Sequence, residues 1–190
     1  MSAIWDHLAP RYDRLLEPFH WPETQLAIAE GISGRILEAG CGTGQLTFDL
    51  LERGLDVYGC DISTAMLEVG RHKLAAHGHD PARLLIGDIT RLPFADDSCD
   101  YVLLTGVLGL LPLRDQRLAL REMLRVCRRG LRLLEPLAVR PRYSLGWTLL
   151  RWKWQMRPVP IEQFRDLQLA YRTGWSTRAG LFSYIQVDKR

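Results

Sequence analysis

The sequence predicts an α/β fold in which a mostly parallel, doubly wound β-sheet closes with an antiparallel C-terminal hairpin. Short apolar runs typical of strands alternate with helical patterns through the middle of the chain, as in a parallel sheet with helices on both faces. Near the C-terminus, two strand-like runs follow one another with no helix between them. A length of 190 residues, 47% of them hydrophobic, suits one core, so we expect residues 1–190 to form a single domain.

Four of the predicted strands lie at residues 35–39, 56–61, 83–87 and 100–105. A helix is expected over residues 45–53, because Gly54 follows it and can end it. A second helix is expected from Ser63, whose hydroxyl can cap the first turn, to about His77. This order of strands and helices is typical of a parallel sheet.

A strongly amphipathic helix is predicted from Arg114 to Arg129, with apolar residues at positions 120, 123, 124 and 127 and arginines mostly on the other side. Arg128 and Arg129 would then lie at the negative end of the helix dipole. Gly130 would end the helix and lead into a fifth strand, Leu131–Glu135.

The C-terminal part is predicted to form a hairpin from residues 167–176 and 181–189. Before it, the segment 143–157 carries an apolar stripe at helical spacing, three tryptophans and several basic residues, and we expect a helix there. Three interpretations of this segment remain open: contact with a membrane surface, the floor of a substrate pocket, and ordinary core packing.

Charge is distributed unevenly along the chain, although the net charge is only +3. Residues 1–113 contain 8 basic and 16 acidic side chains, whereas residues 114–190 contain 17 basic and 6 acidic ones. A basic C-terminal half suits an anionic acceptor, a membrane surface or nucleic acid. Arginines that solvate amphipathic helices would explain the same pattern, and the sequence does not decide between these interpretations.

The four cysteines are far apart and lack the spacing of a metal site, so we expect free thiols in a reducing compartment and no bound metal. The N-terminus has no basic stretch followed by an apolar run. The longest apolar run, Tyr101–Leu113, is too short to cross a bilayer. We therefore expect a cytoplasmic protein.

The most informative motif is the glycine-rich turn Glu38-Ala-Gly-Cys-Gly-Thr-Gly44, placed between a predicted strand and a predicted helix. Glycines at this point allow a sharp turn and let a ligand approach the backbone and the helix start. A dinucleotide-binding fingerprint would need glycine at position 45, where this chain has glutamine. Many doubly wound proteins have a glycine-rich turn for structural reasons alone, so its neighbours matter.

With glycines at 40, 42 and 44 after Glu38, the turn resembles the first motif of class I S-adenosylmethionine-dependent methyltransferases. The resemblance extends through the Gly87-Asp-Ile89 run and the segment 121–136, although Arg128-Arg-Gly130 replaces the usual proline and paired glycines. It implies a seven-stranded Rossmann-like sheet and S-adenosylmethionine as cofactor. It also implies lid helices in residues 1–30, a cofactor-binding core in 35–135, a substrate-side segment in 136–166 and a closing hairpin in 167–190.

The resemblance assigns a role to individual residues near the strand ends. Asp61 would hold the two ribose hydroxyls, although it could instead cap the following helix, where Ser63 competes for that role. Asp88 and Ile89 would contact the adenine ring. The N-terminal run Trp5-Asp-His-Leu-Ala-Pro-Arg-Tyr-Asp13 resembles a family opening that closes over the cofactor, and Tyr12 would line the site. The expected cofactor-binding residues are Tyr12, Glu38, Gly40, Gly42, Gly44, Asp61, Ile62, Met66, Asp88, Ile89 and Thr105.

The acceptor is less well defined by the sequence. The loop 105–112 contains no acid or base, and neither His7 nor His20 is a convincing base, so no catalytic residue is assigned. This apolar loop and the aromatic segment 143–157 favour a small hydrophobic or aromatic acceptor over nucleic acid. Two alternatives remain: an RNA or protein methyltransferase that uses the basic half, and a non-catalytic partner subunit that binds the cofactor.

Overall fold

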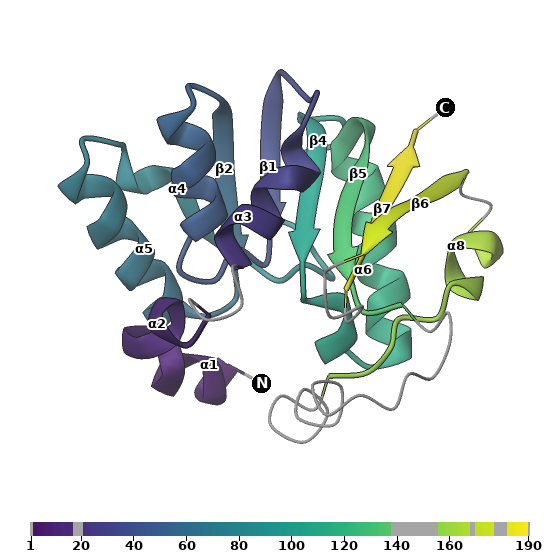
Figure 1. The fold of residues 1–190 in the computed structure, drawn as a ribbon, viewed down its shortest axis with the longest axis horizontal. Coiled ribbons are helices and arrows are strands. Elements are labelled where there is room, and N and C mark those ends of the chain that lie inside the picture. The colour runs from purple at the N-terminus through teal and green to yellow at the C-terminus, as the bar shows by residue number, and fades with distance from the viewer. Residues whose placement is uncertain (1, 17–20, 138–155, 168–169, 177–181, 190) are drawn as a thin grey trace.

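The computed structural model of the chain describes residues 2–16, 21–137, 156–167, 170–176 and 182–189. It contains a seven-stranded sheet in the order β3-β2-β1-β4-β5-β7-β6 (Figure 1). The first five strands in this order run parallel, β7 pairs antiparallel with β5, and β6 pairs antiparallel with β7. The strands are β1 Arg35–Ala39, β2 Asp56–Asp61, β3 Leu84–Ile86, β4 Cys99–Thr105, β5 Cys127–Glu135, β6 Tyr171–Ser176 and β7 Ser183–Asp188. The predicted doubly wound α/β fold with a C-terminal hairpin is confirmed.

Helices cover both faces of this sheet (Figure 1). One face carries α3 (Trp21–Leu26), η3 (Ala27–Ala29), α4 (Gln45–Glu52) and α5 (Thr64–Ala76). The other face carries α6 (Leu113–Val126) and α8 (Glu162–Asp166). The short helices α1 (Ser2–Leu8), η1 (Ala9–Arg11) and α2 (Tyr12–Leu16) lie below the carboxyl ends of the parallel strands, where Figure 1 shows them in purple. Two short 3-10 turns, η4 (Pro81–Arg83) and η5 (Leu108–Leu110), complete the described elements.

Alternate residues of each central strand face opposite layers, as the pleat of a strand requires. On β4, Val102 and Leu104 pack with the α6 layer while Leu103 packs with the α4 layer, and all three are fully buried. Because helices cover both faces of the sheet, the central strands are nearly continuous apolar runs in the sequence. The four cysteines are buried free thiols.

The structure corrects the predicted end of the amphipathic helix. Helix α6 ends at Val126, and strand β5 begins at once with Cys127, so Arg128 and Arg129 lie in the strand and not in a last helical turn. Gly130 does not end a helix. A Cβ atom at Gly130 would lie 2.1 Å from the carbonyl oxygen of Val187, so the position needs glycine because strand β7 passes close by.

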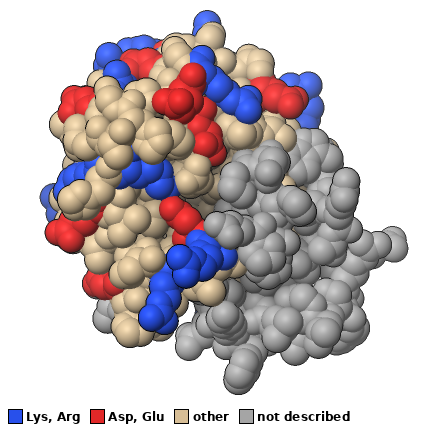
Figure 2. All heavy atoms as spheres, turned by 60° about the vertical axis from the view of Figure 1, so that its left-hand side comes forward, with Lys and Arg blue, Asp and Glu red and all other residues tan. Residues whose placement is uncertain are grey.

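The segment 143–157 lies outside the described residues except for Met156 and Arg157, which are in neither helix nor strand. The predicted helix and its proposed membrane or substrate contact therefore stay predictions. Within the described ranges, no helix is long and apolar enough to span a membrane. Figure 2 views the molecule from the side of α5, and among the described residues drawn there basic and acidic side chains are interspersed.

Candidate functional site

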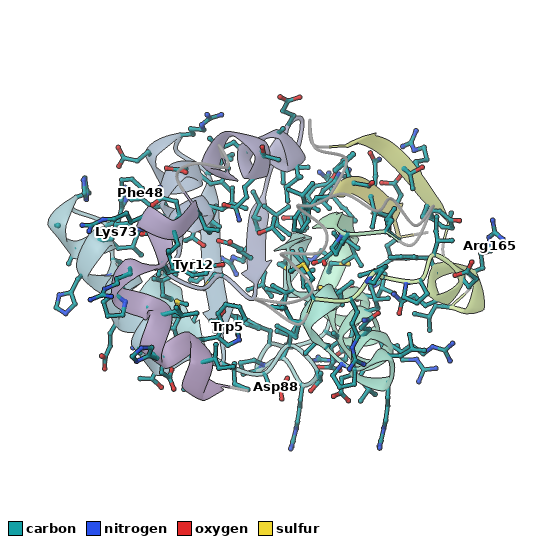
Figure 3. All side chains as sticks on the ribbon, turned by 60° about the horizontal axis from the view of Figure 1, so that its bottom comes forward. Trp5, Tyr12, Phe48, Lys73, Asp88 and Arg165 are labelled. Carbon is teal, nitrogen blue, oxygen red and sulfur yellow. The ribbon has the colours of Figure 1, made fainter. Side chains whose placement is uncertain are left out.

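A cavity of about 450 Å³ opens at the carboxyl ends of β1, β2 and β4, between these strand ends and the N-terminal helices. It lies where the strand order reverses from β1 toward β4, the usual position for a ligand in an open α/β sheet. Figure 3 shows this end of the molecule, with Trp5, Tyr12 and Asp88 labelled. Of the residues predicted to bind the cofactor, these ten line the cavity: Tyr12, Glu38, Gly40, Gly42, Asp61, Ile62, Met66, Asp88, Ile89 and Thr105.

The glycine-rich turn forms one wall of the cavity, and its three glycines have positive φ angles of 71°, 54° and 65°. The backbone N–H of Gly40 donates to the carbonyl of Cys60 at 2.7 Å, which fixes the turn against β2. A Cβ atom on Gly40 would lie 2.7 Å from Val107 Cγ2, so a side chain there would displace the neighbouring loop. Gly44 does not line the cavity; it precedes α4 in a left-handed conformation and packs against Leu84.

Glu38 lies at the base of the cavity and is only 2% exposed. Its Oε2 accepts hydrogen bonds from the backbone N–H of Thr47 at 2.8 Å and from the Thr47 hydroxyl at 2.5 Å, which joins β1 to the first turn of α4. Burial raises the pKa of this carboxyl to about 7, against the lowering effect of the two hydrogen bonds. Its other oxygen, Oε1, has no hydrogen bond within the described part of the chain.

Asp61 ends β2 and holds the glycine-rich turn in place. Its Oδ2 accepts from the N–H of Gly42 at 2.8 Å, and its Oδ1 accepts from the N–H of Ser63 at 2.9 Å. The cap of α5 is Ser63, whose hydroxyl accepts from the N–H of Met66 at 3.2 Å. Asp61 is therefore not the helix cap, and its carboxylate lines the cavity. Burial raises its pKa despite the backbone hydrogen bonds.

Asp88 and Ile89 follow β3 and line the same cavity from the side. Asp88 Oδ1 accepts hydrogen bonds from the backbone N–H and the hydroxyl of Thr90 at 2.8 and 2.7 Å, so the turn is held locally. Asp88 is exposed, while Ile89 is buried beside it. Asp88 therefore has its Oδ2 available to a ligand in the cavity, and Ile89 provides an apolar surface beside it.

The N-terminal helices are tied to the cavity wall by two aspartates. Asp6 Oδ1 accepts a hydrogen bond from the hydroxyl of Ser63 at 2.6 Å. Asp13 accepts a hydrogen bond from the hydroxyl of Thr43 and pairs with Lys73 at 2.8 Å. The sequence motif contains both aspartates, but only Tyr12 was predicted to line the site.

Tyr12 is held between these two anchors and lies next to the glycine-rich turn, since a Cβ atom on Gly42 would lie 3.7 Å from its ring. Trp5 packs against it edge to face, with ring centroids 6.2 Å apart. Burial raises the pKa of the Tyr12 hydroxyl, and the neighbouring Asp61 and Asp13 raise it further. Tyr12 therefore stays a neutral phenol at physiological pH.

Thr105 ends β4 and is held by a residue that the sequence did not single out. The side-chain amide of Gln25 on α3 donates to the Thr105 hydroxyl at 2.5 Å, and both residues are buried and line the cavity. Gln25 carries no local sequence signal, because it is 80 positions from its partner.

The cavity has an acidic part and an apolar part. Acidic side chains on its wall are Asp13, Glu38, Asp61, Asp88 and Asp115, and within the described residues no lysine or arginine lines it. Val107, Leu110 and Leu111, from the loop after β4, form an apolar wall together with Leu16. The carboxylates favour a ligand with positive charge, whereas the apolar wall favours an uncharged one.

This fold and site define an α/β domain with a ligand cavity at the switch point of its sheet. A family model described as a methyltransferase domain matches residues 36–130. The chain belongs to the class I S-adenosylmethionine-dependent methyltransferases, with S-adenosylmethionine as cofactor.

The chain is similar to a demethylmenaquinone methyltransferase of Thermobifida fusca, with 32% identity over 95% of this chain and 82% of that protein. It is also similar to a demethylmenaquinone methyltransferase of Clavibacter sepedonicus, with 36% identity over 70% of this chain, but it spans only 56% of that protein. Among solved structures, it is similar to a Thermotoga maritima protein described as a SAM-dependent methyltransferase and possible histamine N-methyltransferase. That comparison gives a TM-score of 0.72 and 22% identity, with all of both chains covered, and supports the fold alone.

Proposed function

We propose that this methyltransferase transfers the methyl group of S-adenosylmethionine to a small, mainly apolar acceptor with an aromatic or quinone-type ring. The observation that carries the proposal is the apolar wall of Val107, Leu110 and Leu111, which faces the same cavity as Asp61 and Glu38. An uncharged ring can bury its faces against such a wall without leaving polar groups unsatisfied. The names of the two bacterial relatives support a quinone-type ring as the first acceptor to test.

In this proposal, ten of the eleven predicted residues contact the cofactor, each group of them at a different part of it. Asp61 accepts from the two ribose hydroxyls, and Asp88 and Ile89 contact the adenine ring. Ile62 and Met66 line the nucleoside part, and Glu38, Gly40 and Gly42 line the part near the amino acid moiety. Tyr12 and Thr105 lie at the methyl-transfer end, and Gly44 allows the chain to turn into α4. The acidic wall supports these roles because the cofactor carries positive charges on its sulfonium and ammonium groups.

The cofactor supplies an activated methyl group, so the chain's own residues mainly position the acceptor and exclude water. Trp5, Tyr12 and Leu16 would cover the reacting atoms from the lid, and the wall after β4 would hold the acceptor opposite them. A general base is needed only where the acceptor atom must lose a proton, and none is assigned.

The proposal is tested with labelled cofactor offered to lipid, aqueous and nucleic-acid fractions of a bacterial extract, and in parallel to a reduced naphthoquinone. We expect label in the lipid fraction and in the quinol, and much less transfer by the Asp61→Ala variant at limiting cofactor concentration. Label confined to the nucleic-acid fraction would support the RNA alternative instead. Cofactor binding without transfer to any fraction would support a non-catalytic partner subunit.

A further inference from the structure

Glu135 is a buried carboxylate that lies behind the apolar wall of the cavity and does not line the cavity itself. It is the last residue of β5, and its side chain is completely buried. Its Oε1 accepts from the backbone N–H of Val107 at 2.7 Å and of Leu108 at 3.1 Å. Its Oε2 accepts from the backbone N–H of Gly109 at 3.3 Å. One carboxylate thus binds three successive N–H groups of the loop after β4.

These N–H groups begin the 3-10 turn η5, whose own N-cap residue, Val107, provides no side-chain cap. The first N–H groups of a helical turn lack partners within the turn, and leaving them unsatisfied in a buried position is costly. A capping side chain within the loop would normally accept hydrogen bonds from these N–H groups. Here Glu135, on the neighbouring strand β5, accepts them instead. The loop has a second attachment, because the carbonyl of Gly109 accepts from the N–H of Arg157 at 2.7 Å.

We propose that Glu135 is a positioning residue for the acceptor: it holds the loop Gly106–Leu111 in the shape that lets Val107, Leu110 and Leu111 form the apolar wall. This inference rests on the proposed function, because it assigns that wall to the acceptor. The effect is transmitted through the backbone, since Glu135 reaches the cavity only through the loop that it binds.

The surroundings of Glu135 make it sensitive to protonation. Charged or titratable side chains on neighbouring elements are Arg132 on β5 and Tyr184 on β7, which lie toward the opposite face of the sheet, Arg157 beside Gly109, and Asp115 in α6. Arg132 pairs with Asp188, and no lysine or arginine of the described ranges pairs with Glu135. Burial raises the pKa of Glu135 to about 7, although the backbone hydrogen bonds lower it. Protonation below this pH would replace a lone pair with a hydroxyl and weaken the hold on the loop.

The direct test follows the backbone amides of Val107, Leu108 and Gly109 by NMR between pH 5.5 and 8.5, with S-adenosylhomocysteine bound. We expect the three amides to shift together with a midpoint near pH 7, and the titration to disappear in Glu135→Gln. Glu122→Gln is the matched control, because Glu122 also accepts a backbone N–H, that of Leu92 at 2.9 Å, but lies away from the loop. Amides that do not titrate, or that titrate equally in Glu135→Gln, would overturn the proposed role.

The second test measures affinity for a reduced naphthoquinone and for S-adenosylhomocysteine by calorimetry. We expect Glu135→Gln to weaken quinol binding about threefold to tenfold, because an amide can accept at one oxygen only, and to leave S-adenosylhomocysteine binding unchanged. Native protein should also lose quinol affinity as the pH falls below 7. Equal loss for both ligands would indicate a general structural role and contradict the inference.

The two proposals fail in different ways. Amides that titrate in a native protein that binds no quinol would refute the acceptor given under the proposed function, while the hold of Glu135 on the loop would stand. Quinol binding that is identical in native protein and Glu135→Gln would refute the role of Glu135, while the acceptor would stand.

Discussion

Lys73 on α5 and Asp13 on α2 form an ion pair, with Nζ and Oδ2 2.8 Å apart. Lys73 also donates to the side chain of Gln45 at 2.6 Å, and Asp13 accepts from the hydroxyl of Thr43. The pair therefore joins the N-terminal helices to the glycine-rich turn and to α5. The N-terminal helices beside the cavity, which are the expected lid, are thus held by side chains from three separate parts of the chain.

Replacing Lys73 with methionine should loosen this lid. Asp13 would lose its cation, so we expect S-adenosylhomocysteine affinity to fall about twofold to fivefold, a typical range for a partly exposed pair. Hydrogen exchange of the amides in residues 2–16 should become faster. Lys189→Met is the control, because Lys189 pairs with Asp97 on another part of the surface. Unchanged exchange in residues 2–16 would show that the ion pair does not hold the lid.

Replacing Asp61 with alanine should weaken the binding of S-adenosylhomocysteine by roughly 1–3 kcal/mol, because two ribose hydroxyls would lose their acceptor. Calorimetry measures the effect directly. Asp80→Ala is a suitable control, since Asp80 makes a similar local turn contact, to the N–H of Ala82 at 2.9 Å, at a distance from the cavity residues. If both variants bind equally well, Asp61 has no role at the ribose.

The raised pKa of Asp61 adds a pH dependence to the same measurement. The ionised carboxylate is the form that accepts hydrogen bonds from hydroxyls, so affinity should decrease as the pH falls. In Asp61→Asn, which does not titrate, this part of the pH dependence should be missing. A native protein whose affinity is constant from pH 7 to pH 4.5 would contradict the expectation.

Replacing Gly40 with alanine tests close packing at the glycine-rich turn. The new Cβ would lie 2.7 Å from Val107 Cγ2 on a backbone with φ of 71°, so both overlap and backbone strain should destabilise the fold. Gly78→Ala is a matched control, because Gly78 has φ of 78° and nothing within 4 Å of its Cβ position. We expect a loss of about 1 kcal/mol for Gly78→Ala and about 2–4 kcal/mol for Gly40→Ala in denaturant unfolding. Equal losses would mean that the contact with Val107 carries no cost.

The buried carboxyl of Glu38 should make stability depend on pH. Its folded-state pKa of about 7 lies above the ordinary value of 4.5, so the unfolded chain releases this proton more readily than the folded one. The stabilising contribution of Glu38 is therefore fully present below pH 4.5 and is lost as the pH rises toward 7. Over this range the free energy of unfolding should fall by up to about 1.4 kcal/mol per pH unit. The free energy of unfolding of Glu38→Gln should lose this part of the slope and keep the part due to Glu135, whose pKa is also raised to about 7. Glu162→Gln, at an exposed position, should retain both parts. Parallel pH profiles for native protein and Glu38→Gln would contradict the assignment.

The fold and the cofactor could be predicted from the sequence because their signals are local. Strand and helix periods, the glycines at 40, 42 and 44, and the acids at 61 and 88 each lie at a strand end that the sequence marks. Parallel strands bring those ends to one edge of the sheet, so residues that are far apart in the chain line one cavity. Ser63 could also be predicted as a cap, since it acts within its own helix.

The end of α6 could not be predicted, because a distant strand determines it. Arginines at 128 and 129 and a glycine at 130 match a helix end, but pairing of β5 with β4 and β7 extends the strand back to Cys127. The close approach of Val187 explains Gly130 better than any local signal does. Tertiary pairing here overrides a local preference of a few tenths of a kcal/mol per residue.

The sequence by itself therefore determined the kind of fold, the cofactor and most of the predicted residues that line the cavity. Only the tertiary structure decided how the site is held: Asp6 and Asp13 fasten the lid, Gln25 holds Thr105, and Glu135 binds the loop of the apolar wall. Each of these contacts joins residues 26 or more positions apart. Hydrogen bonds of this kind leave no periodicity or spacing in the sequence, because their geometry exists only once the sheet has brought the partners together.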